Sequence, residues 1–62
     1  MTVRFYSEDG KEALEIIPSF EKKCVYIEAI GEDGFSIVTI CLDSFSIDDF
    51  TNTLNDFKER IK

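Results

Sequence analysis

Apolar and polar residues alternate along most of the first forty-two residues of this 62-residue chain. A period of two is typical of β-strands, and it predicts strands at about 2–7, 12–17, 24–31 and 35–42. After residue 45 the period becomes helical, because Ile47, Phe50, Leu54, Phe57 and Ile61 fall on one stripe. This stripe predicts a helix at about 46–61. The whole chain, 1–62, is therefore expected to form one small α+β domain.

The tripeptide Glu-Asp-Gly occurs twice, at 8–10 and 32–34, and each copy separates two predicted strands. Asp-Gly between alternating hydrophobic runs favours a β-hairpin with a type I′ turn. A turn at Asp9-Gly10 places opposite each other those residues whose numbers add up to 19. A turn at Asp33-Gly34 pairs positions that sum to 67, whereas a four-residue loop gives a sum of 65 and leaves the same residues on each face. Two such hairpins predict a four-stranded antiparallel meander.

The segment between the hairpins contains Pro18 and the pair Lys22-Lys23. Proline has no amide proton for a ladder, so Pro18 either ends the second strand or sits at an edge. The lysines suit an exposed turn or a charged edge. Two interpretations of the repeated Glu-Asp-Gly stay open: an internal hairpin repeat, or independent use of a favoured turn.

Polar residues before the helical stripe predict where the helix begins. Ser44 and Ser46 are both candidate N-caps, and Ser46 with Asp49 resembles a capping box. Asp48 and Asp49 are then expected near the positive end of the helix dipole, and Lys58, Arg60 and Lys62 near the negative end.

The alternation divides the sheet residues into two faces, and one helix can cover only one of them. We expect the helix to pack across the face made of Val3, Phe5, Leu14, Ile16, Val25, Ile27, Ala29, Val38, Ile40 and Leu42. The opposite face is also largely apolar in the second hairpin, and such a patch usually marks an interface. The candidate dimer or partner interface consists of Tyr26, Ile30, Phe35, Ile37 and Cys41.

Thirteen acidic and seven basic residues give a net charge of −6 at pH 7. This charge disfavours direct nucleic-acid binding, which normally needs a basic face. It suits either solubility alone or an anionic surface directed at a basic site on another protein. The candidate acidic partner surface lies on the polar side of the helix, at Asp48, Asp49, Asp56 and Glu59.

The sequence does not indicate catalysis or the binding of a metal or cofactor. The chain has no histidine, and Cys24 and Cys41 fall at strand positions without an activating base, so we expect no enzyme. The acidic pairs are explained by turns and by the helix start, and no cofactor or metal site is expected. The N-terminus has no signal-peptide pattern and no run is long enough to span a bilayer, so we expect a cytoplasmic protein with two free thiols.

The join of Ile40-Cys41-Leu42 to Ile47-Asp48-Asp49-Phe50 follows four predicted antiparallel strands. This element order resembles the single-stranded-DNA-binding coactivators related to the Whirly proteins. The resemblance implies a nucleic-acid-binding sheet, but those domains use basic sheet residues that this chain lacks.

Three functions follow as hypotheses. The first is a non-enzymatic, acidic protein-interaction module, homodimeric and of the kind used by phages or mobile elements as an inhibitor or adaptor of a host protein. The second is a single-stranded nucleic-acid-binding module that uses the sheet and Lys22-Lys23. The third is a structural or assembly subunit.

Overall fold

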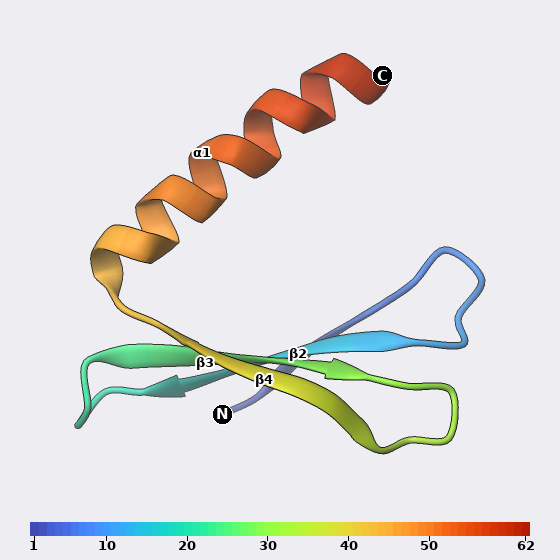
Figure 1. Cartoon of the computed structure of the whole chain (residues 1–62), viewed down its shortest axis with the longest axis horizontal. Coiled ribbons are helices and arrows are strands. Elements are labelled where there is room, and N and C mark those ends of the chain that lie inside the picture. Colours follow the sequence, from blue (N-terminus) through green and yellow to red (C-terminus); the bar gives the residue numbers. More distant parts are fainter.

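The computed structural model describes all 62 residues as one antiparallel sheet followed by one helix (Figure 1). The strands lie side by side in chain order. The predicted α+β meander with a C-terminal helix is confirmed. Its elements are β1 (Val3–Tyr6), β2 (Ala13–Ser19), β3 (Cys24–Ile30), β4 (Ser36–Leu42) and α1 (Ser44–Ile61).

The first hairpin has the predicted register, with Phe5 opposite Leu14 and Val3 opposite Ile16. The turn type differs from the prediction. The amide of Gly10 donates to the carbonyl of Ser7 at 2.9 Å, so Glu8 and Asp9 are the central residues of the turn. A type I′ turn needs positive φ at both central residues. Here only Gly10, which follows them, has a positive φ, of 75°.

The second hairpin repeats this turn. The amide of Gly34 donates to the carbonyl of Gly31 at 2.9 Å, and Gly34 has a φ of 87°. The predicted sum of 67 holds from Val25 opposite Leu42 to Ala29 opposite Val38. The register then shifts, and Ile30 pairs with Ser36. Ile37 is therefore the extra residue of a β-bulge, a feature that bends and twists a strand.

The connection between β2 and β3 is a short turn at 20–23, as the lysine pair indicated. Lys23 takes the left-handed conformation there, with a φ of 56°. Pro18 does not end β2, which continues to Ser19. Because β1 pairs only as far as Ile16, Pro18 lies beyond the end of β1 and has a neighbouring strand on the β3 side alone. The edge interpretation of Pro18 is the correct one.

The helix begins two residues earlier than predicted, and its cap is neither serine. Asp43 is the N-cap, and its Oδ1 accepts from the amide of Ser46 at 2.9 Å. This hydrogen bond, with the amide of Ser46 as donor, lowers the pKa of the Asp43 carboxyl. The predicted capping box between Ser46 and Asp49 is therefore wrong, because an earlier aspartate satisfies the exposed amide.

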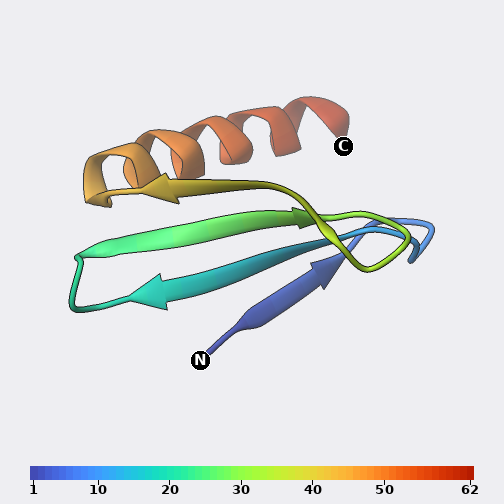
Figure 2. The ribbon, with the colours of Figure 1, turned by 60° about the horizontal axis from the view of Figure 1, so that its bottom comes forward.

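The helix does not lie flat on the sheet. It leaves the end of β4 through the single residue Asp43 and rises at an angle from one face, so that its C-terminus stands clear of the strands (Figures 1 and 2). Ile47 is half-buried, but the exposed fraction of the stripe rises from 42% at Phe50 to 83% at Ile61. The expected close packing of the helix across the sheet is not present within one chain.

The chain is consequently expanded. Only Ile30 is buried, with 9% of its surface exposed. The accessible surface is 5194 Å², whereas a folded monomer of 7.1 kDa exposes about 4,100 Å². The radius of gyration is 12.8 Å, against about 10.6 Å for a compact domain of this length. The structure of the single chain thus leaves about 1,100 Å² more surface in contact with water than its mass requires.

Candidate interaction surfaces

The face of the sheet that is turned toward the helix carries only apolar residues. We call it the inner face and define it by two rows across all four strands: Val3, Ile16, Ile27 and Ile40, then Phe5, Leu14, Ala29 and Val38. A third, shorter row of Pro18, Val25 and Leu42 lies nearest the helix start. No charged residue occurs in these rows. Val3, Phe5, Leu14, Val38 and Ile40 all remain exposed.

The helix stripe lies opposite the inner face. At the helix start, Ile47 shares a hollow with Phe20 and Val25, which directs this side of the helix toward the sheet. Phe50, Leu54, Phe57 and Ile61 continue on the same side, since they follow at helical spacing. Two uncharged apolar surfaces therefore face an open angle, and neither covers the other.

The outer face of the sheet, turned away from the helix, is crossed by a polar row. Register places Arg4 beside Glu15, Glu15 beside Glu28, and Glu28 beside Thr39. Arg4 forms an ion pair with Glu15, and the Thr39 hydroxyl donates to Glu28 at 3.1 Å. The sequence placed these residues on one face but did not reveal their alignment, because the register between β2 and β3 depends on the linker and not on a hairpin turn.

This polar row divides the predicted interface into two parts. Tyr26 and Cys41 lie opposite each other, between this row and the end of the sheet where the helix begins. Ile30 lies on the turn side of the row, but its partner across the strands is Ser36, because the bulge at Ile37 shifts the register, and Phe35 precedes β4. Phe35 and Ile37 are 74% and 67% exposed, but Ile30 is the most buried residue of the chain. The five residues therefore do not make one continuous patch.

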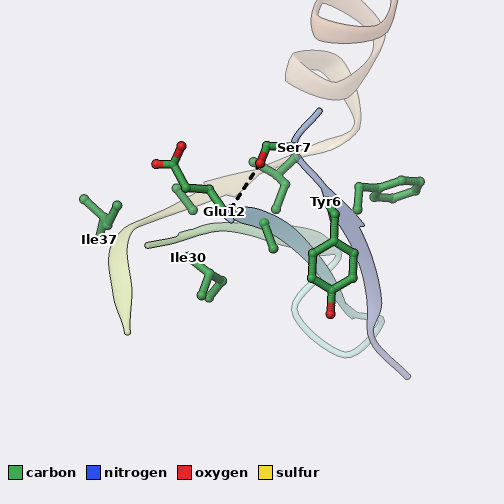
Figure 3. A pocket seen from close by; sticks show the side chains of 9 residues that line it. Tyr6, Ser7, Glu12, Ile30 and Ile37 are labelled. Carbon is green, nitrogen blue, oxygen red and sulfur yellow. Dashed lines mark hydrogen bonds between the residues drawn. The ribbon is translucent and has the colours of Figure 1, made fainter. Parts of the chain in front are cut away.

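An open hollow of about 310 Å³ occupies the turn side of the sheet (Figure 3). Tyr6 and Ile30 project from the side of the sheet away from the helix, and Ile37 lies at the rim of the hollow. The amide of Glu12 donates to the Ser7 hydroxyl at 3.1 Å and closes one end. The hollow is open and mostly apolar, and Ser7 and Glu12 are the polar residues of its lining.

The two thiols meet on the outer face. Cys41 lies opposite Tyr26, as the sum of 67 requires, and Cys24 is the next residue on the same face of β3. Both are free. A hydrogen bond with Cys24 and partial desolvation raise the pKa of the Cys41 thiol, and the charge on Cys24 acts in the same direction. A raised pKa keeps the thiol protonated and therefore less nucleophilic.

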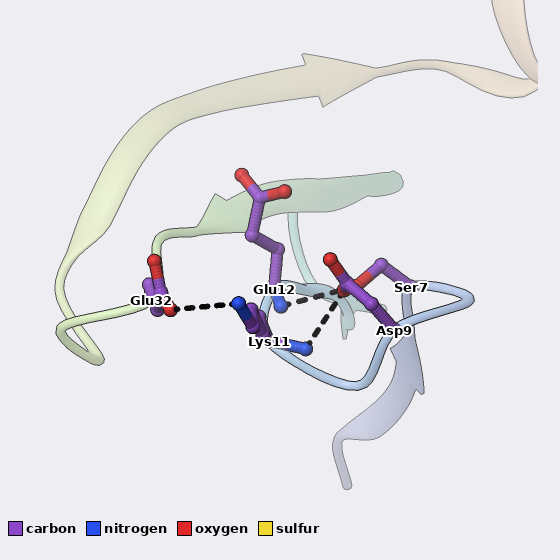
Figure 4. Close-up of polar contacts among 5 residues, drawn as sticks. All are labelled: Ser7, Asp9, Lys11, Glu12 and Glu32. Carbon is purple, nitrogen blue, oxygen red and sulfur yellow. Dashed lines mark hydrogen bonds and ion pairs between the residues drawn. The ribbon is translucent and has the colours of Figure 1, made fainter.

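The two Glu-Asp-Gly turns lie at the same end of the sheet (Figure 4). The amine of Lys11 is 3.8 Å from the carboxylate of Glu32, which links one turn to the other. Asp9 accepts from the amide of Lys11 and Asp33 from the amide of Phe35, each at 3.0 Å. The amide of Lys11 and the Ser7 hydroxyl also lower the pKa of Asp9. Most acidic groups here thus hold the turns in shape.

The four predicted helix carboxylates fall into two classes. Asp56 and Glu59 are paired within the helix, with Arg60 and Lys62, at 3.1 Å each. Asp48 and Asp49 are exposed and have no ion pair. Because the helix begins at Ser44, they lie in its second turn and beyond the reach of the dipole effect assigned to them. Lys58 and Arg60 do lie in the last turn, as predicted.

No group of three or more His, Cys, Asp or Glu side chains is placed to hold a metal ion. The helix has no apolar segment that would let it cross a membrane. Neither a protein-family model, nor a curated protein, nor a solved structure matches this chain.

Proposed function

We propose that this protein is a small, acidic, non-enzymatic protein-interaction module that works as a homodimer and binds a basic site on another protein. The observation that carries the proposal is the combination of a net charge of −6 with about 1,100 Å² of excess surface. Domains this small usually reach stability through disulfides, metals or association. This chain has two free thiols and no clustered metal ligands, and association supplies the missing burial.

The acidic partner surface centres on Asp48 and Asp49. Turn geometry accounts for Asp9 and Asp33, and ion pairs account for Asp56 and Glu59. Capping by Asp43 leaves Asp48 and Asp49 with no structural role at the helix start. Two adjacent, unpaired carboxylates on a helix suit recognition by lysine or arginine side chains. A phage- or mobile-element-type inhibitor or adaptor is the kind of protein that this size and charge support.

Charge reversal tests this assignment. The wild-type chain and the variant Asp48→Lys/Asp49→Lys are immobilised separately and exposed to a lysate of the producing cells. The matched control, Glu8→Lys/Glu21→Lys, makes the same change in net charge at two exposed turn residues that form no ion pair. We expect the wild type and the control to retain the same partner protein. The helix variant should retain at least about tenfold less of it. Circular dichroism checks that all three chains fold alike.

Two results contradict the proposal. Equal retention by the helix variant excludes Asp48 and Asp49 as the partner surface. Strong binding of the wild type to immobilised single-stranded DNA at about 0.15 M salt favours the nucleic-acid alternative, because a chain of this charge should not bind phosphates under those conditions.

A further inference from the structure

We infer that a second copy of this chain fills the open angle between the helix and the sheet, with the helix stripe of each copy lying against the inner face of the other. This inference rests on the proposed self-association and adds where the two copies meet. The contact surfaces are the stripe from Phe50 to Ile61 and the inner face. A two-fold axis relates the two copies.

The excess surface of the chain is as large as the area that a dimer buries. Specific dimers bury about 800 Å² per partner, and obligate ones bury more. The excess of about 1,100 Å² per chain is of this size, and the open angle exposes much of the apolar surface that contributes to it. With one buried residue, the single chain has no core of its own.

The two faces of the sheet differ in how many charged residues they carry. Burying the outer face would remove Arg4, Glu15 and Glu28 from water, and charged groups are costly to desolvate. The inner face and the helix stripe hold no charged residue, so their burial carries no such cost. The inner face is therefore the better dimer surface, although the outer face was the one that the sequence indicated.

The two exposed apolar surfaces of the chain are complementary to each other. The chain exposes both an apolar helix stripe and an apolar sheet face, and each is the natural cover of the other. Asp43 is the only residue between β4 and α1, and its carboxylate fixes the helix start. Because this link is short and capped, it restricts how far the helix can fold down onto the sheet of its own chain. A two-fold exchange satisfies both surfaces at once, because every contact occurs twice.

The first experiment measures solution mass by light scattering over a hundredfold dilution. We expect twice the chain mass of 7.1 kDa. Leu54→Glu places a charge in the stripe and should weaken dimerisation at least about tenfold. Asn55→Glu makes a similar change at the next residue, off the stripe, and should leave the dimer intact. A dimer that tolerates Leu54→Glu overturns the inference.

The second experiment avoids any variant that fails to fold. Isotopically labelled and unlabelled wild-type chains are mixed, and nuclear Overhauser effects between copies are recorded. We expect contacts from the methyl groups of Leu54 and Ile61 to those of Ile27, Val38 and Ile40. Contacts confined to Phe35 and Ile37 overturn the inference and leave the proposed homodimer standing. A monomer at every concentration overturns both.

Discussion

The sheet and the helix of this chain differ in how much of each the chain itself covers. β2 and β3 have neighbours on both sides, and nearly all of their residues are at least half-buried. In α1 every residue except Ile47 is exposed, although Asp43 caps its N-terminus. The strands of the sheet cover one another through their pairing, whereas the helix contacts the rest of the chain mainly near Ile47. A helix in water gains most of its stability from packing its apolar side, so α1 is the element that most needs a partner.

The largest expected effect comes from Phe50, the first exposed aromatic of the stripe. If the stripe is covered in solution, Phe50→Ala should cost about 3 kcal/mol or more of unfolding free energy, because a packed phenyl ring is removed. Urea unfolding measures the change. Asn52→Ala on the polar side is the control and should stay within about 0.5 kcal/mol. A cost below about 1 kcal/mol for Phe50→Ala would mean that the helix stands uncovered in solution.

The next largest effect should come from the sheet turns. Gly34 has a φ of 87°, and Gly10 has a φ of 75° in the equivalent turn. Alanine at either position should cost about 1–2 kcal/mol, since a Cβ disfavours the left-handed conformation. Neither position has an atom within 4 Å of the added Cβ, so the cost is conformational alone. Thermal unfolding measures it, with Glu8→Ala as control. Unequal costs for the two glycines would show that the turns are not equivalent.

A smaller effect should follow from the helix cap. Asp43→Ala removes the acceptor of the Ser46 amide and should lower the melting temperature by a few degrees. Ser46→Ala should have a smaller effect, because it keeps the amide donor and removes only the hydroxyl, which also hydrogen-bonds to Asp43. The reverse order of effects would restore the serine cap that the sequence suggested. Circular dichroism at 222 nm follows both variants.

The smallest expected effect is a loss of stability at low pH. Hydrogen bonds lower the pKa of Asp43 and of Asp9 in the folded chain below their ordinary value of 3.8. A lowered folded pKa stabilises the fold above the ordinary pKa, and this contribution is lost as the pH falls through the folded value. Stability should thus be flat from pH 7 to about 5 with respect to these groups and should fall below pH 4. Asp43→Asn, measured by thermal unfolding across this range, should flatten part of that fall.

Much of the fold could be predicted because local patterns set it. The strand positions, the order of elements and the pairing of Phe5 with Leu14 follow from alternation and from where Asp-Gly occurs. The turn type and the cap were wrong for a common reason. In each case an aspartate side chain accepts a backbone amide two or three residues later, and several nearby residues could have done the same.

The candidate surfaces were harder to predict. The bulge puts Ser36, and not Ile37, opposite Ile30, so the expected face assignment fails for Ile37, and Phe35 lies outside β4. The row from Arg4 to Thr39 also separates Tyr26 from Ile30. That row exists only when three registers align, and the middle one is set by a linker. Asp48 and Asp49 were found from charge alone. Their lack of a capping role became visible only when the helix start was known.

The sequence by itself determined which residues form strands and helix, and which side of each is apolar, because both depend on periodicity over a few residues. The tertiary structure decided the angle between α1 and the sheet, the surface that this angle leaves uncovered, and the alignment of charges across the outer face. These depend on the geometry of a single linking residue and on registers between distant segments. No local pattern in the chain encodes them.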